Sequence, residues 1–196
     1  NYDLVFNLTE GDRGALASLI SGANWRVGLD DPRNMQSVWK KFAYTHKFRT
    51  DYNRRHMVEQ NLDALRRIGI RVPINSEPLL FKIDKKDEFK IQEEVANTTG
   101  LALPNDAVPL EKVKRILMVK FRHLGDVLLM SASLSALKKS MPNAEIDVLI
   151  YSDTVSMLEN HPAIRKIHTA DREWKNFSFV DRLKNEWKCL KNLRKE

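Results

Sequence analysis

The segment from residue 114 to residue 151 constrains the fold most, because it contains a complete strand–turn–helix–strand unit. Residues 115–121 ("RILMVKF") form an apolar run of strand length, and residues 145–151 ("EIDVLIY") form another. Between them, residues 127–140 carry apolar side chains at helical spacing, and Pro142 follows. Two apolar strands joined by an amphipathic helix are typical of a parallel sheet that is covered on both faces.

The rest of the chain continues this alternation. Strands are predicted at 2–8, 25–30 and 165–171, and helices at 10–23, 53–69, 84–97, 153–160 and 178–195. Gly22 and Gly69 are expected to end two of the helices, and Asp84 is a plausible N-cap of a third. Residues 35–50 read as a short helix and a loop. We therefore predict an α/β protein, a Rossmann-like parallel sheet with helices on both faces.

Composition excludes several other classes. No apolar run approaches the roughly 20 residues of a membrane-spanning helix, and "NYDLVFNLTE" does not resemble a signal peptide. Cys189 is the single cysteine and forms no internal disulfide, so a reducing, cytoplasmic compartment is expected. The five histidines are scattered without metal-ligand spacing, so we expect no metal site.

The net charge of +7 suits an anionic partner, although a well-solvated surface of mixed charge explains it equally well. This charge fits three kinds of partner: nucleic acid, a membrane surface, and a phosphorylated small molecule or lipid. The sequence lacks a zinc finger, an aromatic RNA-binding signature and basic-region heptads, so we do not expect nucleic acid to be the partner.

The turn "FRHLGDVLL" (121–129) lies where α/β sheets bind ligands, between the end of a strand and the start of a helix. It contains one glycine and so lacks the glycine-rich loops that bind dinucleotides or triphosphates. It presents Asp126 instead, flanked by Arg122 and His123. Asp126 is either the N-cap of the following helix or a carboxylate held at the crevice, where it accepts a proton from a substrate hydroxyl.

Three separate stretches carry a resemblance to a known family. The first is "RILMVKFRHLGDVLLMSASLSALKKSMPNAEIDVLIY", the second is "HMVEQNLDALRRIGI" and the third is "NYDLVFNLT". Together they resemble the N-terminal lobe of the ADP-heptose:lipopolysaccharide heptosyltransferases, glycosyltransferase family 9. The resemblance implies one lobe of a two-lobed GT-B enzyme.

The order of these stretches departs from the family pattern, in which the Gly-Asp segment comes first. We therefore interpret residues 1–196 as a single circularly permuted lobe. Residues 1–100 would be its second half, 101–113 a joining linker and 114–196 its first half. A protein tolerates such a permutation when its original termini lie close together and its new termini fall in exposed loops. The family's second lobe, which supplies most contacts to the sugar nucleotide, has no counterpart in this sequence.

The resemblance also implies a reaction. The family transfers heptose from ADP-heptose to the phosphorylated inner core of lipopolysaccharide, with inversion and without a metal or other cofactor. Asp126 would be the general base. The other positions implied to contact the substrates are Lys120, Arg122, His123, Gly125, Thr9, Arg33, Arg172, Lys175 and His56. Lys120 could instead be a strand-end lysine that reaches solvent, and His56 could cap or pack its helix.

Expected partners are the lipopolysaccharide core acceptor, ADP-heptose (weakly bound without the second lobe) and that missing C-terminal lobe. The expected location is the cytoplasm, with peripheral contact at the inner face of the cytoplasmic membrane. Two alternatives stay open. The chain is a binding lobe with no turnover of its own, or it is a doubly wound nucleic-acid or protein-interaction module.

Overall fold

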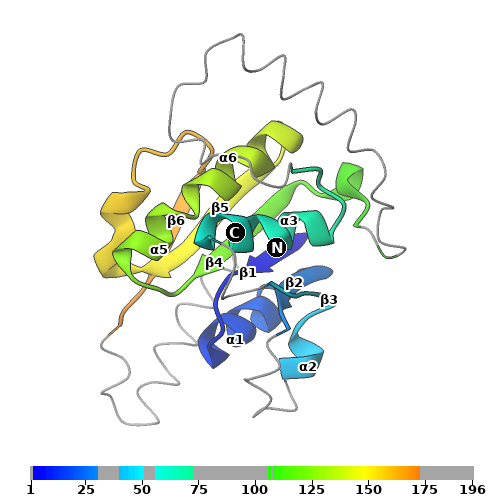
Figure 1. Cartoon of the computed structure of the whole chain (residues 1–196), viewed down its shortest axis with the longest axis horizontal. Helices are drawn as coiled ribbons and strands as arrows, with labels where there is room; N and C mark the ends of the chain where they lie inside the picture. The colour runs from blue at the N-terminus through cyan, green and yellow to red at the C-terminus, as the bar shows by residue number, and fades with distance from the viewer. Residues whose placement is uncertain (1, 31–39, 51–55, 73–105, 107, 173–196) are drawn as a thin grey trace.

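The computed structural model describes residues 2–30, 40–50, 56–72, 106 and 108–172 (Figure 1). Its centre is a six-stranded sheet in which every neighbouring pair is parallel, with the strand order β3-β2-β1-β4-β5-β6. The strands are β1 (Leu4–Asn7), β2 (Trp25–Leu29), β3 (His46–Phe48), β4 (Arg115–Lys120), β5 (Glu145–Tyr151) and β6 (Lys166–Ala170). The predicted α/β, Rossmann-like fold is confirmed.

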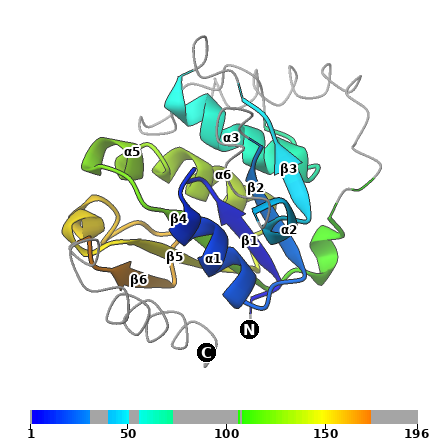
Figure 2. The same ribbon diagram turned by 90° about the horizontal axis from the view of Figure 1, so that it is seen from below.

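Helices cover both faces of the sheet, as predicted (Figure 2). The larger core lies between one face and the helices α3 (Met57–Arg67) and α6 (Ser131–Ser140), which also pack against each other. The smaller core lies on the other face, beneath α1 (Asp12–Ile20), which contacts the short helix α2 (Lys40–Ala43). Because the central strands are buried on both faces, β1 and β4 are nearly continuous apolar runs rather than alternating ones.

The order of the strands is unchanged when the two halves of the chain are exchanged. Read from β4, the strands run β4, β5 and β6 toward one edge, and then β1, β2 and β3 toward the other. In both chain orders the strand sequence reverses direction between β1 and β4. That reversal is the switch point where parallel α/β sheets bind ligands, at the carboxyl ends of the strands.

Three features of the elements differ from the sequence prediction. β3 lies where we expected a loop, because a three-residue edge strand containing His46 and Lys47 is too short to show a pattern. The helix expected at 127–140 is two helices, α5 (Leu124–Leu128) and α6, and the first begins three residues earlier than predicted. The helical stretch expected at 153–160 is the three-ten helix η3 (Ser152–Met157).

Several expectations lie outside the described residues. These are the helices at 84–97 and 178–195 and residues 101–105 and 107 of the linker at 101–113, in which the described part contains the three-ten helix η2 (Leu110–Lys112). Two predicted helix ends are confirmed. Gly22 and Gly69 follow α1 and α3 with φ values of 74° and 90°, a left-handed conformation that glycine adopts without steric cost.

Candidate functional site

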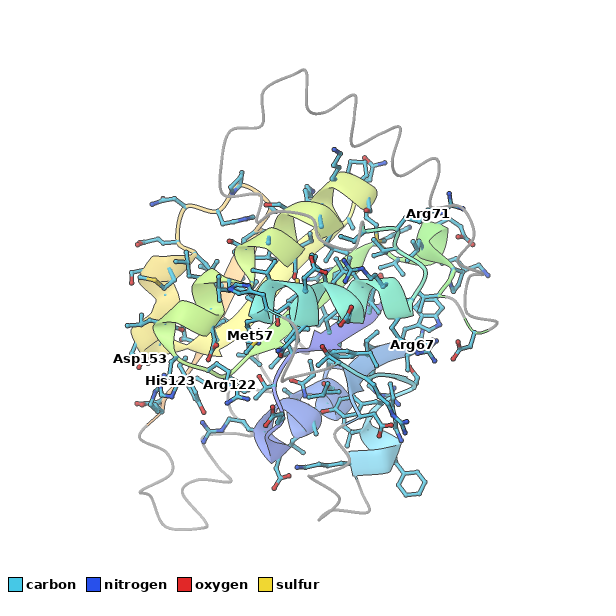
Figure 3. All side chains as sticks on the ribbon, viewed as in Figure 1. Met57, Arg67, Arg71, Arg122, His123 and Asp153 are labelled. Carbon is cyan, nitrogen blue, oxygen red and sulfur yellow. The ribbon has the colours of Figure 1, made fainter. Side chains whose placement is uncertain are left out.

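The candidate site lies at the carboxyl ends of β1 and β4, where the strand sequence reverses. β4 ends at Lys120, and residues 121–123 turn the chain into α5. In Figure 3, Arg122, His123 and Asp153 lie together beside the start of α5, whereas Arg67 and Arg71 lie away from them, at and beyond the last turn of α3. The turn that the sequence singled out is therefore part of a cluster of charged side chains from several elements.

Asp126 is the third residue of α5 and is partly exposed. The interpretation of Asp126 as an N-cap is wrong, because His123 is the N-cap residue and α5 begins at Leu124. A carboxylate in the first turn is still favoured by the partial positive charge of the helix N-terminus. Among the described residues, no hydrogen bond or ion pair holds the carboxylate of Asp126. This partly exposed carboxylate is chemically able to accept a proton.

Lys120 is buried at the end of β4 with 2% of its surface exposed, so the expectation that it could reach solvent is wrong. Its ammonium group donates a 3.0 Å hydrogen bond to Oδ1 of Asn61 on α3 and lies 3.8 Å from the sulfur of Met57. The pKa of Lys120 is lowered to about 8, chiefly by burial. The negative charges of Asp126 and Glu10 oppose this shift, and the positive charge of Arg122 adds to it.

A pocket opens between β4, α3 and the ends of β1, β2 and β3. Its empty space, open mouth included, is about 310 Å³. The lining is partly apolar, and its polar residues are Lys120, Arg122, Glu10 and three uncharged side chains. The lining is formed by Leu8, Glu10, Leu29, Phe48, Thr50, Met57, Gln60, Asn61, Lys120 and Arg122.

A second group of side chains surrounds the turn on the other side of β4. Arg122 forms a 3.0 Å ion pair with Glu10. Arg172 follows β6, and its guanidinium carbon lies 4.5 Å from the centre of the Tyr151 ring. Arg172 also donates a 3.1 Å hydrogen bond to the carbonyl oxygen of Arg122 and lies 3.4 Å from Nδ1 of His123. The structure therefore brings together Arg122, His123 and Arg172, three of the predicted site residues.

None of the remaining predicted residues that the structure describes lines the pocket. The hydroxyl of Thr9 is buried and accepts a 2.8 Å hydrogen bond from the backbone N–H of Phe121, so Thr9 joins the ends of β1 and β4. His56 caps α3 and accepts a 3.3 Å hydrogen bond from the backbone N–H of Val58. Gly125 is exposed within α5. Arg33 and Lys175 lie outside the described residues.

Sequence reasoning missed three polar residues at this site, Asn61, Gln60 and Thr50. Asn61 and Gln60 are buried on α3, next to Val58 and Leu62 of its apolar stripe. A polar side chain at the border of an apolar helical stripe is the signal that could have pointed to Asn61. Thr50 follows β3, the strand that was not predicted, so no sequence pattern placed it at the sheet edge.

The part of the chain that the structure describes lacks two kinds of feature. No group of three or more histidine, cysteine, aspartate and glutamate side chains there could hold a metal ion. Within the same residues, no helix has both the length and the apolar character that crossing a membrane requires.

Two curated proteins are similar to parts of this chain. The lipopolysaccharide heptosyltransferase 3 of Escherichia coli (strain K12) is 36% identical over 73 residues, which are 37% of this chain and 21% of that protein. A lipopolysaccharide heptosyltransferase 3 from Escherichia coli is 45% identical over 47 residues, 24% of this chain and 14% of that protein. The similarity thus spans about a fifth or less of these relatives, and it suggests a glycosyltransferase family. No family model and no solved structure matches the chain.

Proposed function

We propose that this chain is the acceptor-binding lobe of an inverting, metal-independent glycosyltransferase that moves heptose from ADP-heptose to the inner core of lipopolysaccharide. The observation that carries this proposal is the open carboxylate of Asp126 at the carboxyl edge of a parallel sheet, beside the buried cation of Lys120. The part-length similarity to two lipopolysaccharide heptosyltransferases supports the same assignment.

In the proposed reaction, Asp126 acts as the general base. An acceptor hydroxyl gives its proton to the carboxylate while its oxygen forms a bond to the anomeric carbon of the heptose. The bond from that carbon to the phosphate oxygen breaks, and ADP leaves with the electron pair. A positioned base of this kind contributes about 10²- to 10⁴-fold to the rate. The cationic side chains of Lys120, Arg122 and Arg172 would attract the anionic substrates.

The experiment that tests the proposal measures ADP release. The chain is mixed with ADP-heptose and a lipopolysaccharide core acceptor, with and without a separately supplied C-terminal lobe of a heptosyltransferase. We expect ADP release only when both lobes and the acceptor are present. Asp126→Asn should lower the rate by about 10²- to 10⁴-fold, and the exposed Glu159→Gln, which removes the same charge, should leave it unchanged. An unchanged rate in Asp126→Asn would overturn the assignment.

A second candidate function is acceptor binding without turnover. It is favoured by the extent of the similarity, since the matched stretches cover at most 21% of the curated relatives. In this case the chain binds the lipopolysaccharide core, and no ADP is released even after the C-terminal lobe has been added. Calorimetric titration with the core acceptor, run beside the ADP assay, separates the two candidates.

The proposal includes the permuted chain order, in which residues 114–196 correspond to the first half of the lobe and residues 1–100 to the second. The sheet is compatible with this, because its strand order is the same for either order of the halves. Asn1 and Glu196 lie outside the described residues. Fluorophores attached at the two ends should report a short separation, and ends far apart across the sheet would contradict the permuted order.

The proposed location is the cytoplasm, with peripheral contact at the inner face of the cytoplasmic membrane. The net charge of +7 supports this contact, because anionic lipid attracts basic protein surfaces. Sedimentation with vesicles containing anionic lipid should carry the chain down at low ionic strength and release it at high ionic strength. Vesicles of neutral lipid are the control, and equal binding to both would contradict the electrostatic contact.

A further inference from the structure

Three hydrogen-bonding groups that line the same pocket have unused capacity. Oγ1 of Thr50 and Nδ2 of Asn61 are buried, and neither has a hydrogen-bond partner in the described residues. The third group is the ammonium of Lys120. It has three N–H donors and gives one to Oδ1 of Asn61 at 3.0 Å, and the sulfur of Met57, at 3.8 Å, is its one further partner among the residues that the structure describes.

Such an arrangement is unusual for an empty structural pocket. A buried polar group without a partner loses its hydration and gains nothing in exchange, so nearly all such groups in native proteins are paired. Here the groups come from three separate parts of the fold, the end of β4, the first half of α3 and the second residue after β3. Their convergence is what a ligand with several acceptor oxygens requires.

The charge of the pocket selects among such ligands. Of the three groups, only the ammonium of Lys120 is charged, and Asn61, which accepts its hydrogen bond, is neutral. At the rim, the guanidinium of Arg122 is matched by the carboxylate of Glu10 at 3.0 Å. The lining residues thus carry one net positive charge, and the carboxylate of Asp126 adds a negative charge outside the lining that also acts on Lys120. This balance suits one negative charge on a ligand, because a second one would be desolvated without a counter-charge.

We propose that Lys120, Asn61 and Thr50 form a binding pocket for a singly charged oxyanion, of which a carboxylate group is the compact example. Nζ of Lys120, Nδ2 of Asn61 and the hydroxyl of Thr50 donate hydrogen bonds to its oxygens. The apolar walls formed by Leu8, Leu29, Phe48 and Met57 accommodate the carbon skeleton that carries the carboxylate. A phosphate monoester, which carries up to two charges near neutral pH, fits this pocket less well.

This inference goes beyond the proposed transfer reaction, because it assigns a binding role to Asn61 and Thr50 and requires no sugar donor. Its test is a binding measurement on the intact chain. Failure of the transfer assay would therefore leave it standing, and failure of anion binding would leave the role of Asp126 untouched.

The test uses the methyl group of Met57 as a local reporter, since its sulfur contacts Lys120. In a chain with methyl-labelled methionine, sodium acetate should shift the Met57 resonance in a saturable manner at constant ionic strength. Acetamide, the neutral analogue of the same shape, should not shift it. Inorganic phosphate should bind at least several-fold more weakly than acetate, and tighter binding of phosphate would overturn the single-charge assignment.

Three variants complete the test. Asn61→Asp places an internal carboxylate against Lys120, so it should weaken acetate binding at least tenfold while preserving the fold. Lys120→Met removes the cation and should have the same effect. The matched control is Lys114→Met, which removes an exposed lysine at the opposite end of the same strand and should bind acetate as the original chain does. Unchanged binding in Asn61→Asp, or an equal loss in Lys114→Met, would overturn the proposal.

Discussion

The hydroxyl group of Tyr2 donates a 2.6 Å hydrogen bond to the carboxylate of Asp147, across 145 positions of the sequence. Asp147 is 1% exposed, and Arg165 also binds its carboxylate, with Nε 2.9 Å from Oδ1. The ring of Tyr2 lies against the guanidinium of Arg115, 5.2 Å from its carbon. This network lies at the amino-terminal ends of the strands, on the opposite edge of the sheet from the candidate site. It joins the start of the described chain to β5.

Tyr2→Phe should destabilise the fold by about 1–3 kcal/mol, because it removes one donor from a buried carboxylate and leaves the packing of the ring almost unchanged. Urea denaturation followed by circular dichroism measures the change in the free energy of unfolding. Lys166→Met, which replaces an exposed side chain on the neighbouring strand, is the control and should have little effect. Equal stability of Tyr2→Phe and the original chain would show that the hydrogen bond contributes nothing.

Acid should weaken the same network. Burial alone would raise the pKa of Asp147, but hydrogen bonds from His168, Arg165 and Tyr2 hold that pKa well below its usual range. The unfolded chain therefore binds more protons than the folded chain below about pH 4. The stability that Asp147 contributes is fully present above that pH and is lost as the pH falls toward the lowered pKa. Asp147→Asn should be less stable at neutral pH and show a smaller loss of stability in acid.

Alkaline pH should stabilise the protein through Lys120. The pKa of this side chain falls from 10.5 to about 8 on folding, mainly through burial. Between these two values the unfolded chain binds the extra proton, so the free energy of unfolding rises with pH, by about 3 kcal/mol in total. Below pH 8 both states carry the charge, and this contribution is constant. In Lys120→Met the rise should disappear, and parallel stability curves for the two proteins would contradict the lowered pKa.

Replacing two helical glycines by alanine should change the stability of the fold in opposite directions. A Cβ at Gly14 in α1 would overlap the side-chain amide of the buried Asn7, so Gly14→Ala should destabilise the fold. A Cβ at Gly125 in α5 would have no atom within 4 Å. Gly125→Ala should therefore stabilise the helix by about 0.5–1 kcal/mol, because alanine has the higher helix propensity. Thermal unfolding of the two variants tests both expectations, and a loss of stability in Gly125→Ala would contradict the open surroundings.

Gly125→Ala also separates stability from function. If a substrate approaches the backbone of α5 closely, the added methyl group should lower the rate of ADP release while the melting temperature stays the same or rises. A variant that is both more stable and fully active would show that the proposed substrate contact at Gly125 does not exist.

Much of the architecture was determined by the sequence alone, because the patterns involved are local. The apolar runs that became β1, β4 and β5 are continuous, since each of these strands is buried on both faces. Gly22 and Gly69 marked the ends of two helices because the left-handed backbone conformation strongly favours glycine. The turn that contains Asp126 was also found from sequence, as a strand followed directly by a helix.

The pocket was decided by tertiary structure. Lys120 lies 59 positions from Asn61 in the sequence, and these two side chains and Thr50 line one pocket only because the carboxyl ends of β3 and β4 lie at the same edge of the sheet, next to α3. The same is true of the burial of Lys120, since a lysine at the end of a strand is usually exposed and only the packing of α3 over β4 removes it from water. Local patterns specify elements because backbone preferences depend on near neighbours. The environment of a charge depends on distant residues, and so it arises only on folding.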